Sequence, residues 1–147
     1  MATGEKNGLK LIALDADDLA IVSAHVQDAV AKVADMAYLP GEKRFVMVLN
    51  RFDWTTADQP APARRRAGFH FERVLSAKTR GIDLGASGAV VNLLAAEFEE
   101  KGAPSGVVTL FFSGDGAIQL EVECLEAALS DLGPQWPARK RPDHDEE

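Results

Sequence analysis

The sequence predicts an α+β fold: a mainly antiparallel β-sheet of six to seven strands, forming a roll or small barrel, with one N-terminal amphipathic helix. Residues 67–77 and 118–124 alternate apolar and polar side chains, as half-buried strands do. The sequence SGDG at residues 113–116 is typical of a tight hairpin turn. Between residues 16 and 31 the apolar residues recur at three- and four-residue steps, which is typical of a helix packed on a sheet. On strand count alone, a pleckstrin-homology-like barrel is one candidate.

The N-terminal elements follow from caps and periodicity. Residues 9–14 are expected to form a short strand. Asp15 then begins the helix, because its side chain can accept the free N–H groups of the first turn. The helix stripe is expected to comprise Leu19, Val22, Val26, Ala29, Val30 and Val33. Pro40-Gly41-Glu42 supplies a turn, and residues 43–54 form a strand with Phe45, Met47 and Leu49 on one face.

The central segments alternate between loops and strands. The proline-rich residues 55–66 predict a loop, and residues 67–77 predict one continuous strand. The expected inward residues of that strand are Phe69, Phe71 and Leu75, with Arg73 as an exception on the same row. The expected outward residues are His70, Glu72 and Ser76. Glycines at 81–88 turn the chain.

The C-terminal half continues the sheet. Residues 89–99 are apolar on both faces at first, as in a central strand, and residues 107–112 form a short strand. Residues 118–124 follow the hairpin turn, with Cys124 on the inward row. For residues 125–132 two interpretations stay open: a helix, or a strand that continues after a bulge.

The order of elements suggests a repeat. Residues 34–82 and 89–132 each read as strand, turn, strand, loop, strand, with Glu72 and Glu121 at matching places. A duplicated three-strand unit would explain this pattern. An antiparallel meander without duplication would explain it as well, because short strands share composition.

Length and charge bound the class of protein. A chain of 147 residues fits one domain, expected over residues 1–133, with a flexible tail at 134–147. The net charge of −7 argues against a nucleic-acid coat, which needs a basic face. One cysteine allows no internal disulfide, and residues 1–14 lack a signal-peptide core. We therefore expect a cytoplasmic protein with no membrane span.

Four segments together resemble a known family. They are LKLIALDADDLAIVSAHVQDAV, YLPGEKRFVMVLNRFDW, RRRAGFHFERVLSAKTRGID and AIQLEVECLEAALSDLGPQW. Over about residues 8–142 they resemble the domain of unknown function 2948, a family mainly of alphaproteobacteria. The resemblance implies a bacterial, cytoplasmic, single-domain protein. It carries no activity, substrate or catalytic residue.

The strongest chemical signal is a basic segment. Residues 64–80 hold six cationic side chains, among them Arg64, Arg65 and Arg66, against the single acid Glu72. Guanidinium groups bind phosphate and carboxylate through paired hydrogen bonds, so the segment is a candidate anion site. The alternative is that these cations form a solvated face or pair with the protein's own acids.

A second candidate cluster lies further along the same segment. His70 and Glu72 are two residues apart on one strand face, as two metal ligands or a weak acid–base pair would be. No third ligand follows by spacing, so no metal site is predicted. Arg73 on the inward row would need a buried carboxylate, for which Asp53 is a candidate. An inward Cys124 would be inert.

These observations favour a non-enzymatic binding or adaptor module over an enzyme. No phosphate loop, HExxH, CxxC or GxSxG motif occurs, so no catalytic residue and no cofactor is assigned. The candidate binding residues are Arg64, Arg65, Arg66, His70, Glu72 and Arg73. The expected partner is an anionic small molecule or an acidic protein. The alternative is an enzyme or sensor for a small anionic metabolite. Local RNA binding is disfavoured, and a homo-oligomer is possible although no feature requires one.

Overall fold

The structure is a computed structural model that describes residues 8–53, 58, 63–86, 88–133 and 136–137. These residues form one α-helix, one 3-10 turn and ten strands. In chain order they are β1 (Lys10–Ala13), α2 (Ala16–Val26), β2 (Ala29–Leu39), η1 (Pro40–Glu42), β3 (Arg44–Phe52), β4 (Ala63–Phe71), β5 (Val74–Arg80), β6 (Val90–Glu100), β7 (Gly106–Phe112), β8 (Gly116–Val122), β9 (Ala127–Asp131) and β10 (Trp136–Pro137).

All the strand pairs are antiparallel and belong to one open sheet in the order β1-β9-β4-β3-β2-β6-β7-β8-β5, with the short β10 beside β4. The α+β class and the antiparallel sheet are confirmed. The predicted six to seven strands are too few, and the sheet does not close, since β1 and β5 are its two ends. The strand count that suggested a pleckstrin-homology-like barrel is therefore wrong.

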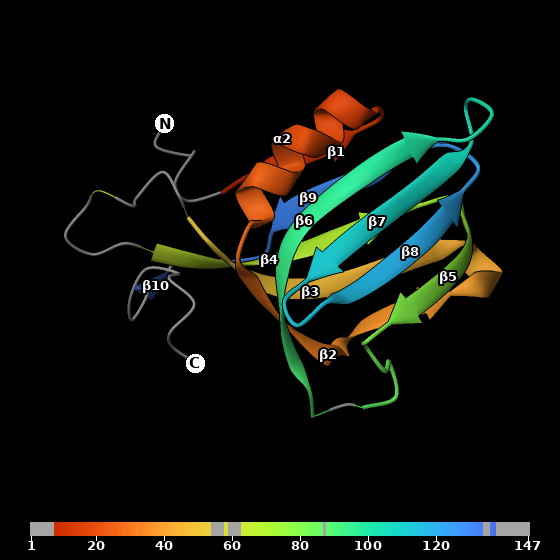
Figure 1. Cartoon of the computed structure of the whole chain (residues 1–147). Coiled ribbons are helices and arrows are strands. Elements are labelled where there is room, and N and C mark those ends of the chain that lie inside the picture. Colours follow the sequence, from red (N-terminus) through yellow and green to blue (C-terminus); the bar gives the residue numbers. More distant parts are fainter. Residues whose placement is uncertain (1–7, 54–57, 59–62, 87, 134–135, 138–147) are drawn as a thin grey trace.

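The sheet curls over so that two layers face each other. Figure 1 shows β6, β7 and β8 in front of β9, β4 and β3, with α2 across the opening between β1 and β6. The large buried side chains come from both layers: Phe45, Met47, Phe69 and Phe71 from one, and Leu93, Leu110, Phe112, Ile118 and Leu120 from the other. The core therefore lies inside the fold of the sheet, and each layer keeps one outer face.

The helix begins as predicted and ends early. Asp15 caps it, with Oδ1 accepting from the Asp18 N–H at 2.8 Å, and Asp18 Oδ2 accepts from the Leu14 N–H at 2.9 Å. The expectation that the helix reaches residue 31 is wrong. Residues 29–32 instead pair with β6, because Asp28 adopts a left-handed φ of 65° and turns the chain into β2. Strand pairing outweighs the helical spacing of Ala29, Val30 and Val33.

The predicted strand at residues 67–77 is two strands. Arg73 has a φ of 61°, which breaks the two-residue period between β4 and β5. After this break Val74 is buried and Leu75 is 44% exposed, so the inward assignment of Leu75 is wrong. The expected loop at 55–66 is also too long, since β4 already begins at Ala63.

The ambiguous C-terminal segment is a strand. Residues 127–131 form β9, which lies between β1 and β4. Cys124 lies between β8 and β9 and is half-buried, so its placement on the inward row of a strand is wrong. Of the predicted tail, Trp136–Pro137 pair with β4, and the other residues lie outside the described part of the chain.

The strand order has an internal two-fold pattern. Exchanging β2 with β6, β3 with β7, β4 with β8 and β5 with β9 gives the order from β9 to β5 again, read from its other end. The two units related by this exchange are β2–β5 and β6–β9. The last strand of each unit pairs with a strand of the other: β5 pairs with β8, and β9 pairs with β4. The end of β4 is followed by Glu72 and the end of β8 by Glu123, so Glu123 rather than Glu121 matches Glu72. A repeat would produce this pattern, but its unit has four strands (β2 to β5, and β6 to β9) and not the predicted three.

Candidate functional site

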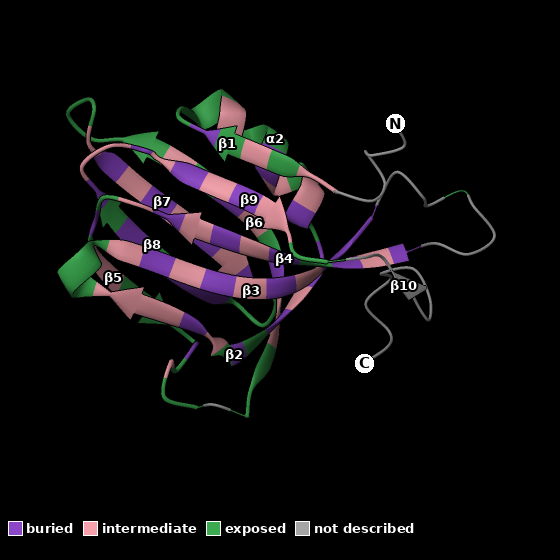
Figure 2. Ribbon diagram, turned by 180° about the vertical axis from the view of Figure 1, so that it is seen from behind, coloured by how far each residue is buried: buried purple, intermediate pink, exposed green. Residues whose placement is uncertain are grey.

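The two faces of β3, β4 and β9 have different roles. Viewed from behind, these strands carry alternating bands of buried and more exposed residues (Figure 2). On β4 the inward row includes Arg65, Phe69 and Phe71, and the outward row includes Arg66 and His70. The predicted site residues are therefore divided between the interior and the surface.

The inward row ends in a buried layer of charge. The Arg51 guanidinium binds Asp131 through Nε to Oδ1 at 2.9 Å and an amino group to Oδ2 at 2.7 Å. Arg65 Nε lies 3.1 Å from Asp53 and 3.7 Å from Asp131. Each of these four side chains is at most 5% exposed. Two cations and two anions balance here, so this layer is not available to a ligand.

This layer corrects two sequence predictions. Arg65 belongs to the interior rather than to a surface anion site. Asp53 does neutralise a buried arginine, as expected, but that arginine is Arg65 and not Arg73. The Arg73 side chain is 59% exposed and lies 3.5 Å from Glu126. Arg64 is half-buried, with its guanidinium donating to the Asn50 carbonyl and 5.9 Å from the Phe52 ring.

His25 lies at the edge of the same layer. Burial lowers its pKa first, and the Arg51 guanidinium lowers it further, against the opposing carboxylates of Asp131 and Asp53. The neutral imidazole is the favoured form, in agreement with its position beside the apolar stripe of the helix.

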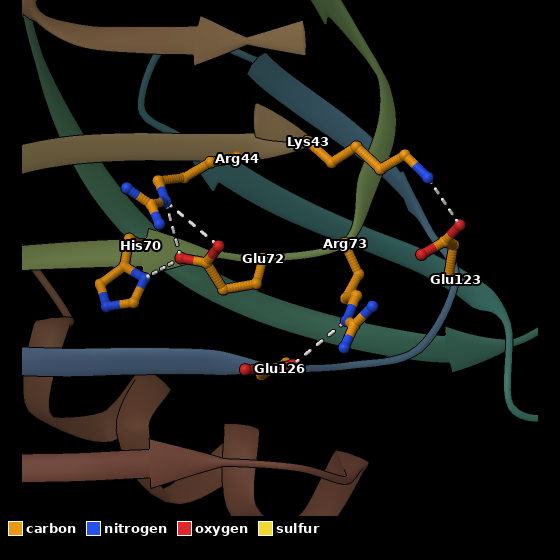
Figure 3. Close-up of polar contacts among 7 residues, drawn as sticks. All are labelled: Lys43, Arg44, His70, Glu72, Arg73, Glu123 and Glu126. Carbon is orange, nitrogen blue, oxygen red and sulfur yellow. Dashed lines mark hydrogen bonds and ion pairs between the residues drawn. The ribbon is translucent and has the colours of Figure 1, made fainter. Parts of the chain in front are cut away.

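The outward row carries a second polar cluster, shown in Figure 3. His70 Nδ1 lies 2.8 Å from Glu72 Oε2, and Arg44 Nε donates to both oxygens of Glu72, at 3.1 and 2.9 Å. The predicted pairing of His70 and Glu72 is thus present, with Arg44 as a third member that the sequence did not indicate. Arg73 lies apart, turned toward Glu126.

This cluster orients the imidazole ring of His70. A carboxylate oxygen can only accept, so in this contact Nδ1 of His70 is the donor to Glu72. Figure 3 shows that the second ring nitrogen points away from Glu72. The side chain of His70 is 41% exposed and that of Glu72 is 20% exposed. The arrangement presents one oriented ring nitrogen of His70 to the surface.

The imidazole borders a hollow of about 350 Å³. Its lining residues are Arg44, Val46, Met47, Val48, Gly68, Phe69, His70, Glu72, Ser130 and Leu132. Gly68 has no side chain, and Val48 and Ser130 stand beside it on the neighbouring strands. The hollow is therefore a mainly apolar depression with a polar end at His70, in the lower part of the size range of ligand sites.

Arg66 lies on the same outward row, two residues before Gly68. Its side chain makes no ion pair within the described part of the chain, and the residue is exposed. Arg64 and Arg66 both lie on the outward row, and Arg66 is the exposed one and the nearer of the two to Gly68 along β4. The sequence missed Arg44, Ser130 and the two valines because they reach this face only through the pairing of β3 and β9 with β4.

Metal ligands do not gather at this site. No group of three His, Cys, Asp or Glu side chains is placed to hold a metal ion anywhere in the described residues. His70 and Glu72 provide two ligands, fewer than a structural zinc site uses. In addition, no described helix has the length and apolarity needed to cross a membrane.

Comparison with known proteins identifies a family and no function. Neither the curated proteins nor the solved structures give a significant match to this chain. One family model, described as a protein of unknown function (DUF2948), matches residues 9–144, as the sequence resemblance predicted. The chain therefore belongs to the DUF2948 family of proteins of unknown function.

Proposed function

We propose that the protein is a non-enzymatic binding module that takes a small amphipathic anion into the hollow beside His70. The observation that carries this proposal is the combination on one sheet face of an apolar depression, an oriented imidazole and the exposed Arg66. As expected from the sequence, we place the module in the cytoplasm.

The lining selects the chemistry of the ligand. Val46, Val48 and Leu132 offer apolar surface to a hydrocarbon body. Arg66 and His70 are four residues apart on β4, so they are separated by about 13 Å at the usual rise of a strand. A carboxylate that pairs with Arg66 therefore leaves the rest of the ligand over Gly68, with its far end near the His70 nitrogen.

Octanoate is a suitable probe, because it combines a carboxylate with a flexible hydrocarbon chain that can lie over Gly68. In an NMR titration of the isotope-labelled protein, octanoate should shift the amide signals of β3, β4 and β9 in a saturable way. Arg66→Ala should weaken this binding about 10-fold or more, as expected for a charge-assisted hydrogen bond. Arg73→Ala, which removes the same charge outside the hollow, should leave it unchanged.

Gly68→Val tests the hollow itself. A Cβ at Gly68 would meet Leu132 at an ordinary 3.5 Å, so the variant should fold while its side chain fills the depression. We expect octanoate binding to be lost with the melting temperature nearly unchanged. Saturable binding that survives in the Gly68→Val variant, or its absence in the unmodified protein, would refute the proposal.

A second candidate function is an enzyme that uses His70 as a general base on the same class of molecule. The observation that favours it is the chain of contacts from Arg44 through Glu72 to His70, which holds the ring. Ser130 lines the same hollow and is a diagonal neighbour of His70 across β4 and β9.

Hydrolysis of p-nitrophenyl butyrate separates the two functions. For an enzyme, we expect turnover above the buffer rate and a loss of about 100-fold in His70→Ala. Glu72→Gln should lower the rate by a smaller factor, since it keeps the shape and removes the charge that orients the ring. A rate equal to that of buffer, together with octanoate binding, supports the binding module alone.

A further inference from the structure

The two-fold pattern of the strand order gives the hollow beside His70 a counterpart. The exchange that maps β3, β4 and β9 onto β7, β8 and β5 also maps the outer face of one layer onto the outer face of the other. On this second face lies another hollow, of about 290 Å³. Its lining residues are Lys78, Thr79, Arg80, Thr109, Phe111, Ala117 and Gln119. The chain thus carries two depressions in equivalent places with different chemistry.

The strand register defines the second hollow in two rows. Gln119 of β8 lies between Lys78 of β5 and Thr109 of β7. One row further, Ala117 lies between Arg80 and Phe111. The small side chain of Ala117 leaves space between the arginine and the aromatic ring, as Gly68 does in the first hollow. Cations therefore line one side, and a hydroxyl and a ring line the other.

The two cations of this hollow have exposed charge. Lys78 and Arg80 are exposed, and neither makes an ion pair within the described part of the chain. They differ in this from Arg65, which is buried between carboxylates, and from Arg73, which is paired with Glu126.

The acids of this face lie outside the lining. Glu121 accepts a hydrogen bond from Ser76, one row away from Lys78. Glu97 is on β6, opposite Thr109, so two strands separate it from Lys78. Because the lining itself holds two cations and no carboxylate, the hollow has a net positive charge.

We propose that this second hollow is a site for a small phosphorylated molecule. Lys78 and Arg80 are alternate residues of one strand face, so they lie about 7 Å apart along β5 and both can reach one phosphate. The planar guanidinium of Arg80 can donate to two phosphate oxygens at once, and the flexible side chain of Lys78 can bring its ammonium group to the same phosphate. The Gln119 amide and the Thr109 hydroxyl are further donors, and the Phe111 ring offers an apolar surface to the rest of the ligand.

Phenyl phosphate is the probe that matches this lining, because it joins a phosphate to one aromatic ring. Its titration should shift the amide signals of residues 78–80, 109–111 and 117–119, with weaker binding as salt is added. Lys78→Ala/Arg80→Ala should lower the affinity at least 10-fold. The control Lys10→Ala/Lys32→Ala removes the same net charge from exposed positions elsewhere and should keep the affinity.

Two further variants make the result specific. Thr109→Val keeps the shape of the side chain and removes one donor, so a 2- to 10-fold loss is expected. Gly68→Val fills the other hollow and should not change phenyl phosphate binding, which separates this site from the proposed function. The proposal fails if the unmodified protein shows no saturable binding, or if both double variants lose affinity equally, as general charge attraction would predict.

Discussion

Arg65 and Arg66 are neighbours on β4 and lie on opposite faces of the sheet, because successive side chains of a strand alternate between the two faces. Arg65 points into the core and is 3% exposed, while Arg66 points to solvent on the face with the hollow. A buried guanidinium requires carboxylates around it, and Asp53 and Asp131 supply them. The run Arg64-Arg65-Arg66 is therefore not one basic patch, and its chemistry differs at each residue.

Asp131 is the residue on which the buried charge layer depends most. Asp131→Ala should destabilise the protein by about 3–5 kcal/mol, because buried Arg51 would lose the carboxylate that it binds and Arg65 would lose one of its two. Chemical denaturation with urea measures this loss. Glu123→Ala is the control: its ion pair with Lys43 is exposed on both sides, and its removal should cost less than about 1 kcal/mol. Equal losses in both variants would contradict the assignment.

His25 predicts a specific dependence of stability on pH. Its folded-state pKa is lowered from 6.5, so below pH 6.5 the unfolded chain binds a proton that the folded chain does not. The contribution of neutral His25 is complete above pH 6.5 and is lost as the pH falls from there toward the folded pKa. Denaturation curves at pH 7.5, 6.5 and 5.5 should show a smaller loss in His25→Gln. An unchanged loss in this variant would assign the effect to other groups.

At the scale of elements, single residues with a left-handed backbone decide where strands begin. Asp28 ends the helical region before β2, and Arg73 separates β4 from β5. Residues 72–73, which link β4 to β5, are hydrogen-bonded to residues 123–126, which link β8 to β9. The Glu72 N–H donates to the Glu126 carbonyl at 2.8 Å, and the Glu123 N–H donates to the Arg73 carbonyl at 2.9 Å. These bonds fix the point at which β5 and β9 pass to opposite layers.

Gly106 tests how closely the β6–β7 hairpin is packed. A Cβ at this position would collide with the Glu99 carbonyl oxygen, which is backbone, and would lie 2.7 Å from the Phe98 ring. Gly106→Ala should therefore destabilise the protein by about 2–3 kcal/mol, as overpacking does. Gly41→Ala is the matched control, since nothing lies within 4 Å of its Cβ. A thermal unfolding midpoint that falls for Gly41→Ala but not for Gly106→Ala would contradict this packing.

At the scale of the whole molecule, the fold is assembled from pairs that are distant in sequence. Lys10 of β1 pairs with Ser130 of β9, and β9 pairs with β4. The exchange of β5 and β9 between the two units means that neither unit completes its layer alone. The two outer faces, each with a hollow, exist only after both units have formed.

This topology predicts slow folding. Non-local strand pairs require long loops to close before they gain contacts, so refolding should take milliseconds to seconds rather than microseconds. Stopped-flow dilution from urea, followed by tryptophan fluorescence, measures the rate. Complete refolding within microseconds would show that local contacts dominate, against the strand order described above.

Part of the candidate site was predictable from the sequence. The outward position of His70 and Glu72 followed from the alternation along β4, and the structure brings the two side chains together. Which of the arginines at 64–66 face inward and which face outward was not predictable, because the sequence analysis placed these residues in a loop. Arg44 and Ser130 join the site through strand register, for which the alternation of a single strand contains no information.

The sequence by itself determined the antiparallel character of the sheet, the helix start at Asp15 and the hairpin before β8, because caps, turns and two-residue alternation are local properties. Tertiary structure alone decided that Ala29–Lys32 belong to a strand, that Arg65 is buried and that two hollows form on equivalent faces. These outcomes depend on which strands lie side by side, and pairing energy between distant segments outweighs local preference.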